Sequence, residues 1–372
     1  AVSRRVITQR NLLEWTTAAQ SAGKPHSGVA GFYRHMAGGT LWGGLMVIIA
    51  LMVSPAAWPL ILPFAILWFF APVIAWWTSR FYQVAQHKPI TAEDIPELRL
   101  TARRTWRFFE TFVTPDENML PPDNFQEDPK PVVAHRTSPT NMGLYLLSTV
   151  AARDFGWAGT FRTLVRLETT FETFHKLARF RGHFFNWYGT QDLRALEPAY
   201  VSSVDSGNLA GHLIVLANTC EEWAAEPLAA NGAKGLMDNL LLAEISFKAL
   251  PPGDADFKRK LWAVLEQIRM DLKGVDDAQM LPLSLKSLLA KASAMVHGVA
   301  RPIDDNAFID LSYWIEALIL AAAEHEYDQQ LTQEMQELVN DRLLKLAAEA
   351  RHMALTMDFA FLLDPERKIG RA

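Results

Sequence analysis

The sequence predicts an all-α protein in which a two-helix transmembrane hairpin precedes a helical soluble domain. Two observations on the sequence support this fold class, and a third bears on function. Residues 36–79 contain no Asp, Glu, Lys, Arg or His. Most of the chain after Arg80 carries apolar residues at helical spacing, and no run alternates as a half-buried strand would. The net charge of -5 gives no support to nucleic-acid binding, which uses a clustered basic face.

The uncharged segment 36–79 is long enough for two membrane helices, since one crossing needs about 20 apolar residues. We place the spans near 38–53 and 60–77. Pro55 and Pro59 supply the break between them, because proline interrupts a continuing helix.

Basic residues lie on both sides of the hairpin, which predicts that both flanks are cytoplasmic. They are Arg4, Arg5, Arg10, Lys24 and Arg34 before it, and Arg80, Lys88, Arg99, Arg103, Arg104 and Arg107 after it. We therefore divide the chain into a juxtamembrane arm at 1–35, the hairpin at 36–79 and a cytosolic domain at 80–372. Apolar residues between 12 and 18 fit either a short helix lying on the bilayer or a plain linker.

The soluble domain shows a succession of helical patterns. They cover 91–113, 139–153, 156–177, 208–220, 232–250, 254–272, 281–297, 304–326 and 329–363. A proline-rich segment at 114–140 cannot be helical. It ends at Ser138 and Pro139, which read as an N-cap followed by proline at the first helical position.

The long connection at 184–208 is rich in aromatic and hydrogen-bonding residues, unlike the helices around it. Connections of that length in a compact domain are usually functional or disordered, and disordered segments are poor in aromatics. Successive antiparallel helices alternate in direction, so the helices after HRTSPTN and VDSGN begin at the same end of the domain. Both helix starts and the connection should therefore form one pocket.

Flat rings and polar side chains together suit a sugar polymer, since rings cover the apolar faces of a pyranose and polar groups bind its hydroxyls. The expected rings are Trp187, Tyr188 and Tyr200, with Trp106 as a further candidate. The expected polar groups are Arg136, Asn141, Asn186, Asp205, Ser206 and Asn208. Two alternatives stay open: Ser138 and Asp205 or Ser206 act only as helix caps, and His135 and Arg136 only hold the proline-rich segment.

A catalytic pair is not evident. Asp205 is the best-placed acid, but glycoside chemistry needs a second carboxyl group about 5–9.5 Å away, and none can be assigned. His325 has no metal-binding partner at helical spacing, so we expect no metal site, and no phosphate loop or nucleophile motif points to a cofactor. Cys220 is the single cysteine and lies in an apolar helical run, which fits a buried thiol.

Two long stretches resemble cyclic β-1,2-glucan synthases. They read RTWRFFETFVTPDENMLPPDNFQEDPKPVVAHRTSPTNMGLYLLSTVAARDFGW and GHFFNWYGTQDLRALEPAYVSSVDSGNLAGHL, and the resemblance extends through essentially the whole chain. These are very large enzymes of the bacterial inner membrane, which use UDP-glucose and cyclize their product in an (α/α)6-toroid domain. The resemblance implies three partners: linear β-1,2-glucan, the lipid bilayer and the remaining domains of a synthase.

The resemblance further implies that the chain is the membrane hairpin plus the first part of the cyclization domain. About nine predicted helices follow the hairpin, whereas an (α/α)6 toroid has twelve, so the toroid is expected to be incomplete. The family's catalytic carboxylates lie further along, and no catalytic residue is carried over. Another class of function is a membrane-tethered glycan-binding or scaffold module without catalysis. An isoprenoid enzyme is disfavoured, because Asp304 and Asp305 lack the rest of a diphosphate-binding motif.

Overall fold

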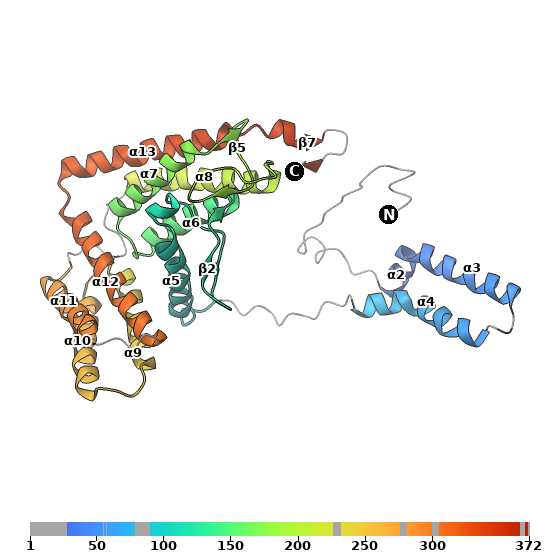
Figure 1. The fold of residues 1–372 in the computed structure, drawn as a ribbon, viewed down its shortest axis with the longest axis horizontal. Coiled ribbons are helices and arrows are strands. Elements are labelled where there is room, and N and C mark those ends of the chain that lie inside the picture. Colours follow the sequence, from blue (N-terminus) through green and yellow to red (C-terminus); the bar gives the residue numbers. More distant parts are fainter. Residues whose placement is uncertain are drawn as a thin grey trace. The chain divides into compact units, whose positions relative to one another are not determined.

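The computed structural model describes residues 28–54, 56, 58–78, 90–225, 232–275, 281–299, 305–364 and 369–370. The chain divides into two compact units, Ala1–Thr91 and Ala92–Ala372 (Figure 1). The predicted arm helix at 12–18 and most of the basic flanks lie outside the described residues.

The first unit contains the hairpin, with α2 at Val29–His35, α3 at Ala37–Val53 and α4 at Trp58–Thr78. Both predicted spans therefore have a helix at their positions. Many apolar side chains of α3 and α4 are exposed, as expected of surfaces that face lipid. Trp68 lies against the backbone of Gly43, where an added Cβ would sit 3.1 Å from the ring. A small residue thus lets the two helices approach closely.

Among the residues that the structure describes, length and composition identify two helices that could cross a membrane, α4 and α12 (Asn306–Gln330). Only 6% of the apolar window of α4 is buried, against 44% for α12. Because α12 packs its apolar face inside the second unit, it is a core helix, and α4 is the stronger membrane candidate. The apolar helix α3 is shorter, with 17 residues.

Every helix predicted after residue 90 has a counterpart in the second unit. The remaining helices are α5 (Ile95–Phe112), α6 (Pro139–Asp154), α7 (Thr160–Lys176), α8 (Ser203–Ala225), α9 (Gly232–Ala249), α10 (Ala255–Lys273), α11 (Leu283–His297) and α13 (Gln333–Leu355). The largest differences from the predicted boundaries lie at α8 and α13. Helix α8 begins five residues before Asn208, and α13 ends at Leu355 and is followed by a 3-10 turn at Phe359–Leu362.

The expectation of no strands is corrected by four small antiparallel ladders within the described part of the chain. Each joins two strands of two residues: β1 (Phe125–Gln126) with β2 (Val132–Val133), β3 (Arg136–Thr137) with β6 (Tyr188–Gly189), β4 (Arg179–Phe180) with β5 (His183–Phe184), and β7 (Leu363–Asp364) with β8 (Ile369–Gly370). Such short ladders lack the alternating pattern from which strands are read, so the sequence could not reveal them.

Two large hydrophobic clusters form the core of the second unit. One gathers side chains of α6, α7, α8 and α13, and the other gathers side chains of α9, α10, α11 and α12. In Figure 1, α13 runs beside α7 and α8, while α9 to α12 form a separate group. This packing of helical hairpins confirms the mostly helical fold class, and the toroid arrangement stays a prediction.

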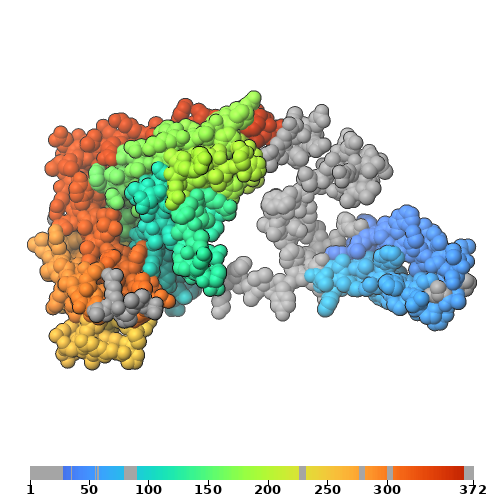
Figure 2. Space-filling model, viewed as in Figure 1, coloured from blue at the N-terminus to red at the C-terminus, as the bar shows by residue number. Residues whose placement is uncertain are grey.

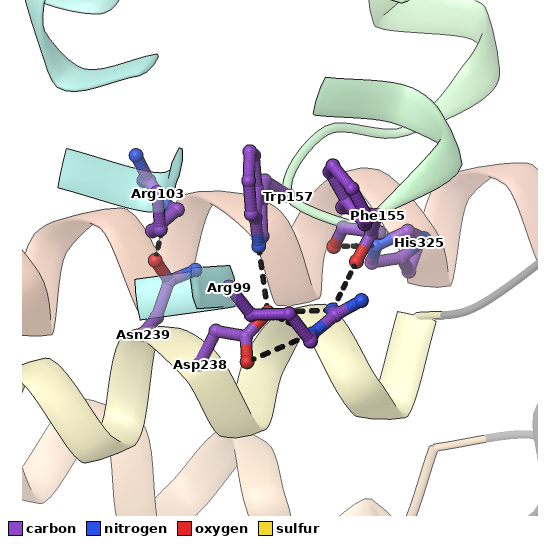
Figure 3. A network of polar contacts seen from close by, with 8 residues as sticks. Arg99, Arg103, Phe155, Trp157, Asp238, Asn239 and His325 are labelled. Carbon is purple, nitrogen blue, oxygen red and sulfur yellow. Dashed lines mark hydrogen bonds and ion pairs between the residues drawn. The ribbon is translucent and has the colours of Figure 1, made fainter. Parts of the chain in front are cut away.

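A polar network lies where these groups meet α5 (Figure 3). Asp238 of α9 accepts hydrogen bonds from Arg99 and from Trp157 Nε1, and Asn239 accepts one from Arg103 Nε at 2.6 Å. His325 Nε2 lies 2.8 Å from the carbonyl oxygen of Gly156. These contacts give partners to the Asp238 carboxylate, the Trp157 N–H and the Asn239 side-chain oxygen, whereas Asn239 Nδ2 has no hydrogen-bond partner among the described residues.

Candidate functional site

The start of α6 is built as its sequence predicts. Ser138 Oγ accepts the backbone N–H of Asn141 at 3.2 Å, and Pro139 occupies the first helical position. Just before it, β3 pairs with β6, so that Arg136 lies opposite Gly189. Figure 2 shows the yellow-green surface of the long connection next to the green surface around the start of α6. The predicted meeting of these segments is confirmed.

The second helix start, that of α8, lies beside the first. Asp205 Oδ1 accepts a hydrogen bond from Thr140 Oγ1 at 2.6 Å, and Asn208 Nδ2 donates to the same hydroxyl oxygen at 3.3 Å. At the other end of both helices, Trp223 Nε1 donates to Asp154 Oδ1 at 3.0 Å. The two helices therefore run parallel, as predicted.

The structure corrects the reading of Asp205 and Ser206 as caps. Helix α8 begins at Ser203, and the cap is Ser202, whose Oγ accepts the backbone N–H of Asp205 at 3.2 Å. The Asp205 side chain is thereby free of capping and turns to Thr140. The sequence offered several polar residues in a row, and only tertiary packing decides which one starts the helix.

Asn186 is the centre of the site. Its hydrogen-bond neighbours set the orientation of its amide. The nitrogen donates to Asp205 Oδ2 at 3.1 Å, while the oxygen accepts from Tyr200 Oη at 2.7 Å and from Trp187 Nε1 at 2.6 Å. Both acceptor positions are then used. Since Asn186 is only 7% exposed, its evident role is to hold the two rings and the carboxylate in place.

Trp187 and Arg136 form the exposed edge of the site. The guanidinium lies 4.8 Å from the centroid of the Trp187 ring and donates to Asp123 Oδ2 at 2.9 Å. Asn141 Nδ2 donates to the other oxygen of Asp123 at 3.3 Å. Asp123 was missed by sequence reasoning, because nothing near it in the proline-rich segment points to Arg136 or Asn141 as its partner.

Tyr188 is a correction. It is fully buried, its hydroxyl donates to the carbonyl oxygen of Ala178 at 2.5 Å, and it accepts the N–H of Phe185 at 2.7 Å. Burial raises its pKa, and the ring packs near Phe184. Tyr188 therefore belongs to the core and offers no surface to a ligand.

Ser206 is a second correction. It is 2% exposed and precedes the buried Leu209 and Leu213 by three and seven residues, so it lies on the core-facing stripe of α8. Among the described residues its hydroxyl has no hydrogen-bond partner. The residues of the predicted set that stay accessible are Arg136, Asn141, Trp187, Tyr200, Asp205 and Asn208.

A further carboxylate, that of Glu117, contacts residues next to the site. It is 7% exposed and lies 2.7 Å from His135 Nδ1, and it accepts hydrogen bonds from Thr190 and Gln191. These contacts agree with the alternative role of His135 and Arg136, which is to hold the proline-rich segment. His135 is tied to Glu117 and Arg136 to Asp123, which holds the proline-rich segment to the body.

The acids with raised pKa values lie elsewhere, on α12. Burial raises the pKa of Glu324 to about 7 and that of Asp328 to about 6. Glu324 accepts the N–H of Gly159, and Asp328 accepts those of Thr160 and Phe161. These two carboxylates therefore cap the start of α7 from a neighbouring helix. Within the described residues, no group of three His, Cys, Asp or Glu is placed to hold a metal ion.

No protein-family model matches the chain. Over 98% of its length, in an alignment of 378 residues, the chain is 39% identical to the cyclic beta-(1,2)-glucan synthase NdvB of Rhizobium meliloti (strain 1021). The alignment covers 13% of that much longer protein. The resemblance predicted from the two quoted stretches is thereby confirmed: over nearly its whole length, this chain is related to a segment of a cyclic β-(1,2)-glucan synthase.

Proposed function

We propose that this chain is the part of a membrane-bound cyclic β-1,2-glucan synthase that anchors the enzyme and binds linear glucan during cyclization. The observation that carries the proposal is the Asn186 network, which fixes Trp187, Tyr200 and Asp205 beside the start of α6. A ring held at a set angle can cover a sugar face without first losing side-chain entropy. Relatedness to a glucan synthase supplies the ligand class.

The anchoring role rests on the hairpin. Its helices expose apolar side chains that water would not favour, and basic residues flank it on both sides. By the positive-inside rule the soluble unit then lies on the cytoplasmic face of a bacterial inner membrane, where UDP-glucose would be the glucosyl donor of the complete enzyme. The remaining domains of the synthase are its partners.

Binding without catalysis is the second candidate for this chain taken alone. The acids of the site are all engaged: Glu117 with His135, Asp123 with Arg136 and Asp205 with Thr140. Carboxylates held in this way position neighbours and read hydroxyl groups. The acid and base of the transglycosylation would then come from elsewhere in a synthase, and the chain alone should neither cyclize nor hydrolyse linear glucan.

The test is binding of a linear β-1,2-gluco-oligosaccharide to the purified chain in detergent, by isothermal titration calorimetry. Covering one face of Trp187 removes about 50 Å² of apolar area from water, which is worth about 1.3 kcal/mol or roughly tenfold in Kd. Trp187→Ala should therefore weaken binding about tenfold. Trp262→Ala, which removes a part-buried Trp on α10, is the matched control and should leave Kd unchanged.

Asp205→Asn sharpens the test. Because Asp205 is no cap, the fold should keep its melting temperature, while the carboxylate that accepts from Asn186 and Thr140 is lost. In a full-length synthase in membranes, the variant should cyclize supplied linear glucan more slowly. Full activity with Asp205→Asn, together with unchanged binding in Trp187→Ala, would refute the proposed site.

A further inference from the structure

A cavity of about 330 Å³ lies between α5, α7 and α12. Indole rings of Trp106 and Trp157 and the phenol of Tyr313 line it, and the small side chains of Ala158, Ala317 and Ala321 leave the space open. Ligand pockets range from about 300 to 1,000 Å³, so this one suits a single small molecule and no polymer helix or nucleotide chain.

The cavity is separate from the Asn186 site. Thr140 contacts that site, and Thr149 lines the cavity, and both residues belong to α6. Nine residues of α-helix correspond to about 14 Å of rise and about half a turn beyond two full turns. The two sites therefore lie about 14 Å apart along α6 and on its opposite faces.

Two buried polar groups at the cavity have no hydrogen-bond partner among the described residues. They are Trp106 Nε1 and Thr163 Oγ1, on residues that are 3% and 2% exposed. Most buried polar groups find a partner, and each exception calls for an explanation such as a ligand or a bound water. An indole N–H donates, and a hydroxyl donates and accepts.

Both acidic and basic side chains line the cavity. Glu110 accepts hydrogen bonds from Arg103 and Tyr313, and Arg166 donates to the hydroxyl of Tyr145 at 3.3 Å. An anion entering here would meet Glu110 and Glu324, and a cation would meet the arginines. A neutral ligand with an apolar face and several hydroxyl groups fits this lining best.

Glu324 adds a pH-dependent element to the lining. Burial raises its pKa to about 7, against the lowering effects of the Gly159 N–H and of Arg162, whose Nε lies 3.9 Å away. Asp328 on the same helix and Glu110 on α5 act in the same direction as burial. Near neutral pH the protonated carboxyl can donate a hydrogen bond to a hydroxyl oxygen, which an ionised carboxylate cannot.

We propose that this cavity is a second carbohydrate site, which takes one or two pyranose units. The choice of β-1,2-linked glucosyl units rests on the proposed function, and the requirement for a neutral, pyranose-sized sugar rests on the cavity itself. Such a site would hold part of a glucan away from the Asn186 site.

The experiment titrates the full chain in detergent with sophorose, the β-1,2-linked glucose disaccharide, and follows saturation-transfer NMR and calorimetry. Ala317→Leu fills the cavity and should weaken sophorose binding at least tenfold. Ala323→Leu, the same change at an exposed position of α12, lines a different groove and should have no effect. Thr163→Val removes the unpartnered hydroxyl at nearly constant volume and should weaken binding severalfold.

The two sites are distinguished by combining variants. Trp187→Ala should leave sophorose binding at the cavity intact, and Ala317→Leu should leave oligosaccharide binding at the Asn186 site intact. If Trp187→Ala has no effect on any ligand, the proposed function fails while the cavity site can still stand. Sophorose binding that survives Ala317→Leu in the Trp187→Ala background would overturn the inference, as would inorganic phosphate binding at the cavity in place of the sugar.

Discussion

Asp238 is the carboxylate at which three segments of the second unit meet (Figure 3). It is 5% exposed and accepts hydrogen bonds from Arg99 Nη2 at 2.6 Å and from Trp157 Nε1 at 2.8 Å. Arg99 Nη2 also donates to the carbonyl oxygen of Phe155 at 3.0 Å. Asp238→Ala should therefore leave a buried indole N–H without its acceptor and a mostly buried guanidinium without its counter-charge.

The size of the loss follows from burial. Removing one partner of a buried ion pair costs about 3–5 kcal/mol, and an unsatisfied buried N–H costs about 1–3 kcal/mol. The Arg99 side chain is 21% exposed and can bind water once Asp238 is gone. The two costs should therefore not add in full. We expect Asp238→Ala to lower the free energy of unfolding by about 4 kcal/mol.

Asp310→Ala is the matched control. Asp310 also pairs with an arginine of α5, Arg107, and the nitrogen–oxygen distance is again 2.6 Å. Its side chain is 46% exposed, against 8% for Asp238. Surface ion pairs contribute about 0–1 kcal/mol. Asp310→Ala should therefore lower the free energy of unfolding by at most that amount, although the two ion pairs have the same nitrogen–oxygen distance.

Urea unfolding of the full chain in detergent, followed by circular dichroism, measures both variants. If the unfolding curves of both variants have the same slope, their midpoints give the loss in free energy of unfolding for each variant. The two losses should differ by about 3 kcal/mol. Equal losses in Asp238→Ala and Asp310→Ala would show that burial does not set the strength of these pairs, which would refute the reasoning.

Two further predictions concern α7 and α9. Burial raises the pKa of Glu324 and Asp328 to about 7 and about 6, so between about pH 4 and pH 7 the folded chain binds more protons than the unfolded chain. The free energy of unfolding should thus fall as pH rises through this window, by no more than about 3 kcal/mol per group. Urea unfolding at pH 5 and pH 8 measures this fall in the free energy of unfolding. Glu324→Gln should make the fall smaller. A wild-type chain that is more stable at pH 8 than at pH 5 would contradict the prediction. Gly235→Ala would place a Cβ 1.9 Å from the carbonyl oxygen of Gly156 and should lower the melting temperature strongly, whereas Gly211→Ala, with open space, should not.

The sequence was informative wherever a signal is local. Helices follow from spacing, and the capped start of α6 follows from two adjacent residues, Ser138 and Pro139. The convergence of α6 and α8 needed only the rule that helices two apart run parallel. These features depend on residues close together in the chain, so one sequence suffices to predict them.

Features that depend on distant partners could not be predicted. Arg99 and Asp238 are 139 residues apart, and nothing in either neighbourhood points to the other. Tyr188 looked like an accessible ring because it adjoins Trp187, yet β6 turns it into the core. Glu117 and Asp123 read as ordinary acids of a proline-rich segment until the fold brings His135 and Arg136 against them.

The long connection also owes its order to such distant contacts. At its beginning, Gly182 has φ of +82° and lies so close to Thr356 that an added Cβ would sit 2.2 Å from the carbonyl oxygen. Arg181 pairs with Asp358 there, and Phe180 packs edge-on against Phe361. This end of the connection is therefore fixed to the end of α13.

The other end is fixed through contacts with Asn186, which ties Trp187 and Tyr200 to Asp205 in the first turn of α8. A connection held at both ends pays little further entropy when it binds a ligand, since its rings are already placed. That explains why so long a segment between helices carries aromatic rings and hydrogen-bonding groups together. The polar groups hold the segment in place, and the rings of Trp187 and Tyr200 stay partly accessible beside them.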